Sequence, residues 1–247
     1  LTTEPPMQRS RRPFFGWWVS TTAATMFAIQ TAAWGATFGA YLLQFQDEFG
    51  WSKLAISTAY SASHLISGLL SPGQGWMVDR LGSRFVMRVG VMMLGVGFIL
   101  LSQVNSLWFF YAIVLMVGLG VNLAGFITLN TAVANWFIRK RALALGLSST
   151  GIGLGGLLAP LVTWLLVNHG WRPTAFWTGI VIMVIALPLS TLLRQRPQEY
   201  GMLPDGAHPG QEGEAPAPLP TSVTTVDFTV GEALRDRSFW LVSVGHG

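Results

Sequence analysis

The stretch VGVMMLGVGFILLSQVNSLWFFYAIVLMVGLGVNLAGFITLNTAVANWFI, residues 89–138, contains no charged side chain. A helix that crosses a bilayer needs about 20 mostly apolar residues, so this run is long enough to cross twice. The polar segment SQVNS at 102–106 is the place where the chain is expected to turn back. Backbone amides in hydrocarbon need partners within their own segment, and the alternating pattern of a barrel strand is absent, so both crossings are predicted to be helices.

More charge-free runs flank this stretch on both sides, at 13–46, 54–78, 142–168 and 173–193. Only 11% of the residues are charged, against roughly a quarter in ordinary soluble domains. The sequence therefore predicts an all-α membrane protein with six spans, at 15–43, 54–77, 86–103, 107–136, 142–168 and 172–193. The chain has no cysteine, which excludes disulfides and thiolate metal sites.

Basic residues are distributed unevenly between the two ends of these spans. All but Lys53 and Arg172 of the fifteen Lys and Arg residues fall on one side of the alternating topology. By the positive-inside rule, the N-terminus, the 78–88 and 137–141 turns and the segment after Arg194 are predicted to be cytoplasmic, in a plasma or inner membrane. This topology explains the net charge of +4, and no nucleic-acid partner is expected.

The predicted organisation has four parts: a cytoplasmic tail at 1–13, the six-span bundle at 14–194, a linker at 195–230 and a terminal segment at 231–247. The linker is rich in Pro, Gly and acidic residues, as is typical of flexible cytoplasmic segments. The terminal segment is interpreted as an amphipathic lead-in followed by a truncated seventh span. Because the chain begins with Leu1 and stops within this apolar run, it is expected to be a piece of a longer protein.

A charged motif with regularly placed glycines, GWMVDRLGSR at 75–84, connects the second and third predicted spans. Its pattern resembles the signature loop of the major facilitator superfamily, although Phe85 stands where a second basic residue is common. The resemblance implies a cytoplasmic latch between the two halves of a transporter. Asp79 is expected to pair with Arg84, with the basic run at 139–141 or with a helix N-terminus. The residues assigned to this latch are Gly75, Asp79, Arg80, Gly82, Arg84, Arg139 and Arg141.

A longer segment, NWFIRKRALALGLSSTG at 135–151, narrows the resemblance. It is similar to the loop from span 4 into span 5 in the monocarboxylate porter and oxalate/formate antiporter branches. FFGWWV at 14–19, EFGWS at 48–52 and RPQEYGMLPDG at 196–206 look like the same branches. The resemblance implies two inverted three-helix repeats that form the N-terminal half of a transporter of about twelve spans. It also implies transport of a small organic anion, a mono- or dicarboxylate, by alternating access, with proton symport and exchange for a counter-anion both open.

Small residues recur every four positions in two of the predicted spans. Ser67 and Ser71 belong to such a stripe in the second span, and Gly151 and Gly155 to one in the fifth, where close helix packing is expected. These two spans are hypothesised to be the ones that rock against the other half. GIGLGG at 151–156 also satisfies the dinucleotide-binding pattern, but no strand precedes it, so no cofactor is predicted.

Polar side chains within the spans are the candidates for a substrate path. Gln30, His64 and Asn122 fall at the same predicted depth, near the midplane, where transporters of this kind bind their substrates. In ideal helices, Trp34 and Tyr41 share a face with Gln30, while Phe126 and Asn130 share one with Asn122. The alternative for each polar residue is a hydrogen bond between helices. Apart from Arg88 and Arg172 near their ends, the predicted spans contain no Lys or Arg, so the cationic partner of an anion is expected from the missing C-terminal half.

Other functions stay open at this point. An efflux pump for amphipathic molecules would suit an aromatic, uncharged path, and a non-transporting sensor or scaffold could share the fold. An enzyme is not predicted, because His64 is the only ionisable side chain deep in a span and nothing in the chain pairs with it. No catalytic residue and no metal site are therefore assigned.

The predicted orientation can be tested by labelling single cysteines, because the chain contains none of its own. A membrane-impermeant maleimide added to intact cells should label a Lys53→Cys variant and should leave a Lys140→Cys variant unlabelled until the cells are opened. Labelling in the reverse order would show that the bundle is inverted.

Overall fold

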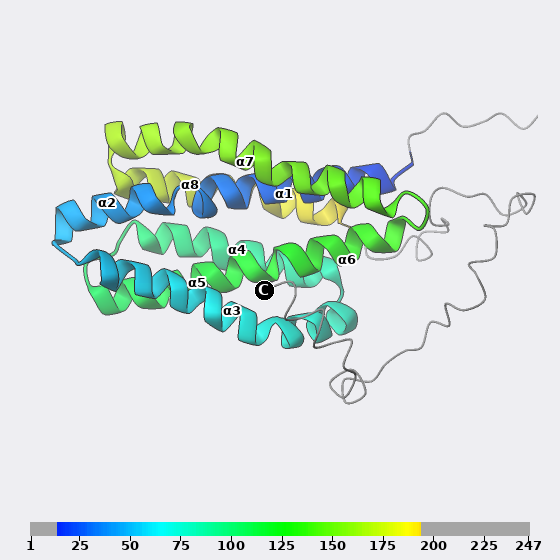
Figure 1. The fold of residues 1–247 in the computed structure, drawn as a ribbon, viewed down its shortest axis with the longest axis horizontal. Helices are drawn as coiled ribbons and strands as arrows, with labels where there is room; N and C mark the ends of the chain where they lie inside the picture. Colours follow the sequence, from blue (N-terminus) through cyan, green and yellow to red (C-terminus); the bar gives the residue numbers. More distant parts are fainter. Residues whose placement is uncertain (1–13, 194–247) are drawn as a thin grey trace, which may run out of the picture. The chain divides into compact units, whose positions relative to one another are not determined.

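Helical segments follow one another through residues 14–193, the part of the chain that the computed structural model describes (Figure 1). Most of the predicted spans correspond to one of these helical segments. The segments are α1 (Gly16–Gln30), the π-helical turn η1 (Thr31–Gly35), α2 (Phe38–Phe49), α3 (Lys53–Leu81), α4 (Ser83–Leu101), α5 (Leu107–Leu123), α6 (Phe126–Trp136), α7 (Arg141–His169) and α8 (Trp171–Leu192). The predicted tail at 1–13, the linker and the seventh span lie outside the described residues.

Two of the predicted spans are not continuous helices. The span predicted at 15–43 is interrupted by η1 and continues as α2 to Phe49, and the span predicted at 107–136 is interrupted at Ala124–Gly125. The second span also differs, because α3 continues to Leu81 and therefore includes Asp79. The turn into α4 consists of Gly82 alone, whose φ of 87° lies in the left-handed region that favours glycine.

The helices differ in whether they are long and apolar enough to cross a membrane. Four stretches of the described residues are long and apolar enough to cross a membrane: 83–101, 107–136, 141–169 and 171–192. The predicted spans 15–43 and 54–77 do not reach the same measure. The first is divided by η1, and α3 contains several Ser and Gly residues as well as His64 and Gln74. The prediction of an all-α bundle of apolar helices is confirmed, while the inverted repeat stays a prediction.

Glycines allow the helices of this bundle to approach one another closely. A Cβ added to Gly151 would lie 1.9 Å from the carbonyl oxygen of Ala24, so α7 packs directly on the backbone of α1. Gly179 also brings α8 close to Gly95 of α4, since a Cβ there would lie 2.6 Å from the Gly95 carbonyl oxygen. Such close approach increases the van der Waals contact that holds membrane helices together.

The small-residue stripes predicted from the sequence face neighbours inside the bundle. A Cβ added to Gly155 would lie 2.5 Å from the carbonyl oxygen of Ala28 in α1. In α3, Ser67 donates to the carbonyl oxygen of Gly118 in α5 over 3.4 Å, whereas Ser71 donates within its own helix. The large apolar residues on other faces of α3 and α7 are exposed, for example Leu69 at 72% and Leu157 at 77%.

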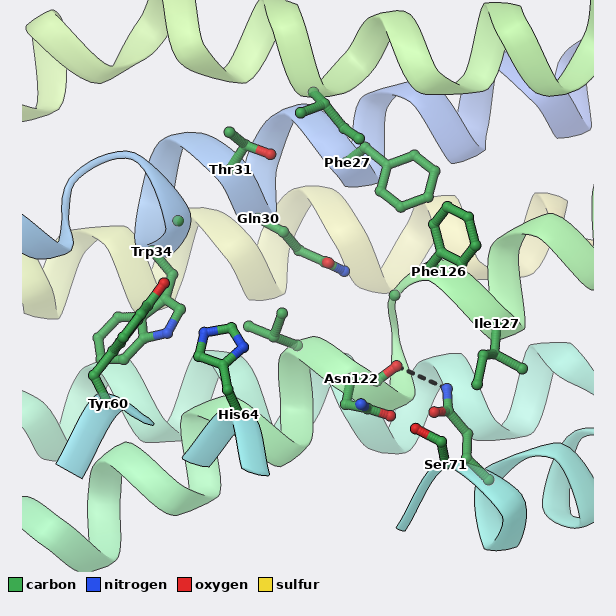
Figure 2. Close-up of a pocket in the computed structure, with 15 residues that line it drawn as sticks. Phe27, Gln30, Thr31, Trp34, Tyr60, His64, Ser71, Asn122, Phe126 and Ile127 are labelled. Atoms are coloured by element: carbon green, nitrogen blue, oxygen red, sulfur yellow. Dashed lines mark hydrogen bonds between the residues drawn. The ribbon is translucent and has the colours of Figure 1, made fainter. Parts of the chain in front are cut away.

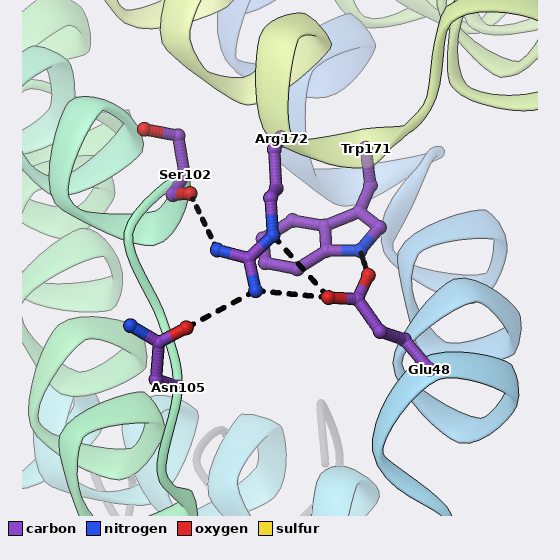
Figure 3. A network of polar contacts seen from close by, with 5 residues as sticks. All are labelled: Glu48, Ser102, Asn105, Trp171 and Arg172. Atoms are coloured by element: carbon purple, nitrogen blue, oxygen red, sulfur yellow. Dashed lines mark hydrogen bonds and ion pairs between the residues drawn. The ribbon is translucent and has the colours of Figure 1, made fainter.

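A polar network joins three helix ends at one end of the bundle (Figure 3). Arg172, at the start of α8, forms an ion pair with Glu48 of α2 at 2.9 Å and donates to the Ser102 carbonyl and the Asn105 side chain, both at 3.1 Å. The Trp171 indole also donates to Glu48. Desolvation alone would raise the pKa of Glu48, but the hydrogen bonds from Arg172 and Trp171 and the guanidinium charge outweigh it, so this pKa lies below its usual value.

At the opposite end of the bundle, two arginines from the start of α4 contact the C-terminal end of α8. Arg84 donates to the carbonyl oxygen of Thr191, and Arg88 donates to the Ser190 hydroxyl over 3.2 Å. Cations are favourable near the C-terminal carbonyls of a helix, because these groups lack backbone donors and carry partial negative charge. The third and sixth predicted spans are thereby fixed to one another at both ends.

The close contact at Gly151 predicts a large difference between two glycine substitutions that are two residues apart in α7. Gly151→Ala should lower the free energy of unfolding by about 1–3 kcal/mol, because α1 and α7 must separate to admit the methyl group. Gly153→Ala is the matched control, since nothing lies within 4 Å of a Cβ added there. Thermal unfolding of the purified proteins in detergent provides the comparison, and equal melting temperatures would contradict the packing described.

The Arg172 network predicts a pH-dependent contribution to stability. Arg172→Gln should cost less than about 1 kcal/mol, because the two charged side chains are 37% and 41% exposed and are screened by water. The pKa of Glu48 is lowered in the folded state, so this contribution is present above the ordinary Glu pKa of about 4.3 and is lost as the pH falls through the lower folded value.

Melting temperatures at a series of pH values would test this expectation. The wild type should exceed Arg172→Gln at pH 7 and lose this advantage in acid, whereas Lys53→Gln, a cation outside the network, should show no such trend. A difference that persisted below a pH of about 3 would show that packing of the Arg172 side chain, and not the ion pair, stabilises this end.

Candidate functional site

A cavity of about 510 Å³ lies between α1, η1, α3, α5 and α6 (Figure 2). Its walls combine aromatic rings with polar groups that carry no formal charge. Among the described residues that line it there is no Lys, Arg, Asp or Glu. The polar and aromatic lining consists of Phe27, Gln30, Thr31, Trp34, Tyr60, His64, Ser71, Gln74, Asn122 and Phe126.

Most of the residues assigned to the substrate path from the sequence meet at this cavity. They come from five separate elements, and Figure 2 shows Gln30, His64 and Asn122 around one space. Two residues of the set do not line it, because Tyr41 is fully buried against Phe98 and Asn130 lies further along α6. The residues brought together are Gln30, Trp34, His64, Asn122 and Phe126.

The two residues outside the cavity both follow a helix break. Tyr41 was placed on the Gln30 face by assuming a regular α-helix, but η1 has the wider π-helical turn and changes the register of every later residue. Asn130 was placed on the Asn122 face in the same way, and the break at Ala124–Gly125 lies between them. Hydrophobic pattern alone does not reveal such breaks, because it is insensitive to backbone hydrogen bonding.

His64, in the middle of α3, supplies the imidazole among the lining residues. Its side chain is exposed toward the cavity, and its ring meets Tyr60 edge-on with centroids 4.5 Å apart. No hydrogen bond joins the imidazole to another described residue. Tyr60 in turn packs on Trp34, which is only 2% exposed. The imidazole is therefore available to a bound molecule, whereas the aromatic residues mainly shape the wall.

The other lining amides are already hydrogen-bonded within the bundle. Gln30 donates to the Ala124 carbonyl oxygen over 2.9 Å, and Asn122 donates to the Ser67 carbonyl oxygen over 3.3 Å. Gln74, which sequence reasoning missed, donates to the Asn122 carbonyl oxygen over 2.7 Å. The available signal for Gln74 was its position seven residues after Ser67, on the same helical face.

The residues assigned to the latch lie around the Gly82 turn and the start of α7. Asp79 is exposed and makes no ion pair with another described residue, because Arg84 donates to Thr191 instead. Arg80 stacks its guanidinium 5.2 Å above the Trp76 ring, and Arg139 and Arg141 are exposed. Gly75 has open space around it, since nothing within residues 14–193 lies within 4 Å of a Cβ added there.

The sequence motifs considered for other chemistry have structural explanations. GIGLGG at 151–156 lies in the middle of α7, so it does not form the strand, turn and helix of a dinucleotide site. No group of three or more His, Asp or Glu residues within 14–193 is arranged to hold a metal ion.

Comparison with known proteins gives two findings. A family model described as Major Facilitator Superfamily matches residues 23–245. The chain is also similar to a curated protein named oxalate:formate antiporter, from Oxalobacter formigenes, with 29% identity over 197 residues. The aligned region is 80% of this chain and 43% of that relative, so this chain spans less than half the length of the relative.

Proposed function

Because this chain belongs to the Major Facilitator Superfamily, we propose that it supplies one half of a secondary transporter for a small organic anion. The cavity between α1, α3, α5 and α6 is its contribution to the substrate path. The observation that carries this proposal is the convergence of Gln30, His64 and Asn122 on one cavity from three different spans. The similarity to a protein named oxalate:formate antiporter supports a mono- or dicarboxylate as the substrate.

The lining chemistry suits a small anion that meets its positive partner elsewhere. A donor such as the His64 imidazole can orient carboxylate oxygens without holding them too tightly. A charge in a low-dielectric cavity is costly unless an opposite charge accompanies it. Since no Lys or Arg lies among the lining residues described, we assign the cationic partner to the remainder of the transporter.

Alternating access requires the bundle to move as a unit, and its internal contacts support such movement. The glycine contacts between α1 and α7 and the Arg172 network join the predicted spans to one another. The exposed Asp79 beside the Gly82 turn has its carboxylate available for a partner on the other half. In this proposal, that contact is the latch, formed in one state of the transporter and broken in the other.

The relative's name, oxalate:formate antiporter, favours exchange of one anion for another as the mode of transport. Oxalate and formate are therefore the substrates to test first. A hydrophobic cation such as tetraphenylphosphonium is the probe for the alternative in which the aromatic walls serve an efflux pump.

The complete protein in formate-loaded liposomes should take up radiolabelled oxalate faster than in empty liposomes. His64→Ala should raise the KM for oxalate about tenfold, the effect of one lost hydrogen bond to a charged group. His169→Ala is the matched control, because His169 ends α7 and does not line the cavity.

Each possible result of this assay bears on the proposal. Uptake of oxalate that depends on internal formate would support exchange, and equal uptake in empty liposomes would favour symport. Absence of flux for any carboxylate, with binding of tetraphenylphosphonium, would reject the organic-anion assignment. Equal KM values for the His64 and His169 variants would exclude His64 from substrate contact.

A further inference from the structure

The break between α5 and α6 exposes three carbonyl groups that a continuous helix would use. In an unbroken α-helix, the N–H groups of residues 126, 127 and 128 would donate to the carbonyl oxygens of residues 122, 123 and 124. None of these three bonds is present, because α5 ends at Leu123 and α6 begins at Phe126.

Side chains from three different elements donate to these three carbonyls, and the Asn122 carbonyl oxygen also accepts the Gly125 N–H over 3.0 Å. Gln74 of α3 donates to the Asn122 carbonyl oxygen over 2.7 Å, and the Thr128 hydroxyl donates to that of Leu123 over 2.6 Å. Gln30 of α1 donates to the Ala124 carbonyl oxygen over 2.9 Å. All three donor residues are buried, at 3%, 0% and 6% exposure, so water cannot easily take over their role.

The backbone donors on the other side of the break have no such replacement. Within residues 14–193, the N–H groups of Phe126, Ile127 and Thr128 have no acceptor. Phe126 and Ile127 border the cavity, where a polar molecule can reach them. The two sides of the break therefore differ. Its carbonyl oxygens accept hydrogen bonds from side chains, while its amides are free to pair again.

Gly125 makes the broken form sterically possible. A Cβ added to Gly125 would lie 2.4 Å from the Val121 carbonyl oxygen and 3.2 Å from that of Asn122. A regular α-helix accepts a Cβ at any position, so the clash is a property of the broken form alone. Alanine at this position would thus favour the continuous helix.

We propose that the break at Ala124–Gly125 is a two-state hinge in the fourth span, and that Gln30 and Gln74 act as positioning residues that hold its broken form. In the straight form, the amides of residues 126–128 reclaim the three carbonyls. The side-chain amides of Gln30 and Gln74 are then released beside the cavity.

This release connects the hinge to the proposed function, on which the following step rests. A carboxylate in the cavity accepts the same N–H groups of Gln30 and Gln74 that hold the broken form. A substrate that takes these donors leaves the Ala124 carbonyl without a partner and the Asn122 carbonyl with the Gly125 N–H alone, and straightening restores the lost bonds. Substrate binding thereby favours the straight form, as a ligand must if it binds that state more tightly.

Hydrogen exchange at residues 126–128 measures the state of the hinge directly. In the complete transporter in lipid nanodiscs, these amides should exchange rapidly, because they lack acceptors. Gly125→Ala and Gln74→Ala should each slow their exchange about tenfold or more, since both changes disfavour the broken form. Unchanged or faster exchange at these amides in both variants would show a fixed kink and overturn the hinge.

Two control variants separate the hinge from general effects on the cavity. Gly35→Ala places a methyl group in the cavity wall where nothing lies within 4 Å, and Ser71→Ala removes a lining hydroxyl that is bonded within its own helix. Both should leave exchange at 126–128 unchanged. Misfolding of a variant would instead accelerate exchange along all of α6, and Gln30→Ala then provides the second test of the same carbonyl contacts.

Oxalate binding to the wild type and to Gly125→Ala tests the substrate link separately. Saturating oxalate should slow exchange at 126–128 in the wild type, and Gly125→Ala should bind oxalate more tightly because its hinge is already straight. Weaker binding by Gly125→Ala would mean that the anion occupies the free amides of the broken form, and would overturn the link. If oxalate is not a substrate at all, the exchange rates of the variants still decide whether the hinge exists.

Discussion

Hydrogen bonding of the backbone in an apolar surrounding is the constraint on which this structure depends. An amide that loses its helical partner in hydrocarbon cannot turn to water, so a break in a spanning helix must provide its own donors. The fourth span meets this condition with Gln30, Gln74 and Thr128, each directed at one released carbonyl. The same residues border the cavity or support its wall, so the side chains that hydrogen-bond the broken backbone also form the site.

Most of the fold could be predicted from the sequence, because charge-free length is a direct consequence of the membrane. Helix α7 spans Arg141–His169 where 142–168 was predicted, and α8 agrees as closely. The interruptions at Thr31–Gly35 and Ala124–Gly125 could not be predicted, since apolar residues continue through both. Tyr41 and Asn130 were assigned across these interruptions, and the cavity contains neither of them.

Small residues in this bundle serve contacts between its own helices. Gly151 and Gly155 are covered by α1, and Ser67 by α5, so the faces of α3 and α7 that remain open are those with large apolar residues. Spacing predicted the stripes as surfaces of close approach, but it carried no information about which neighbour approaches. Gln74 was missed for a related reason, because one amide in a serine-rich face has no distinctive pattern.

The connection between α3 and α4 is a single glycine with φ of 87°. A connection of one residue cannot absorb an insertion, so an extra residue there would rotate or shift one helix relative to the other. Reporter tags and fluorescent fusions are therefore poorly suited to this corner, even though it is exposed. Because only Gly82 separates the two helices, a shift of α3 at Asp79 would have to move the start of α4 as well.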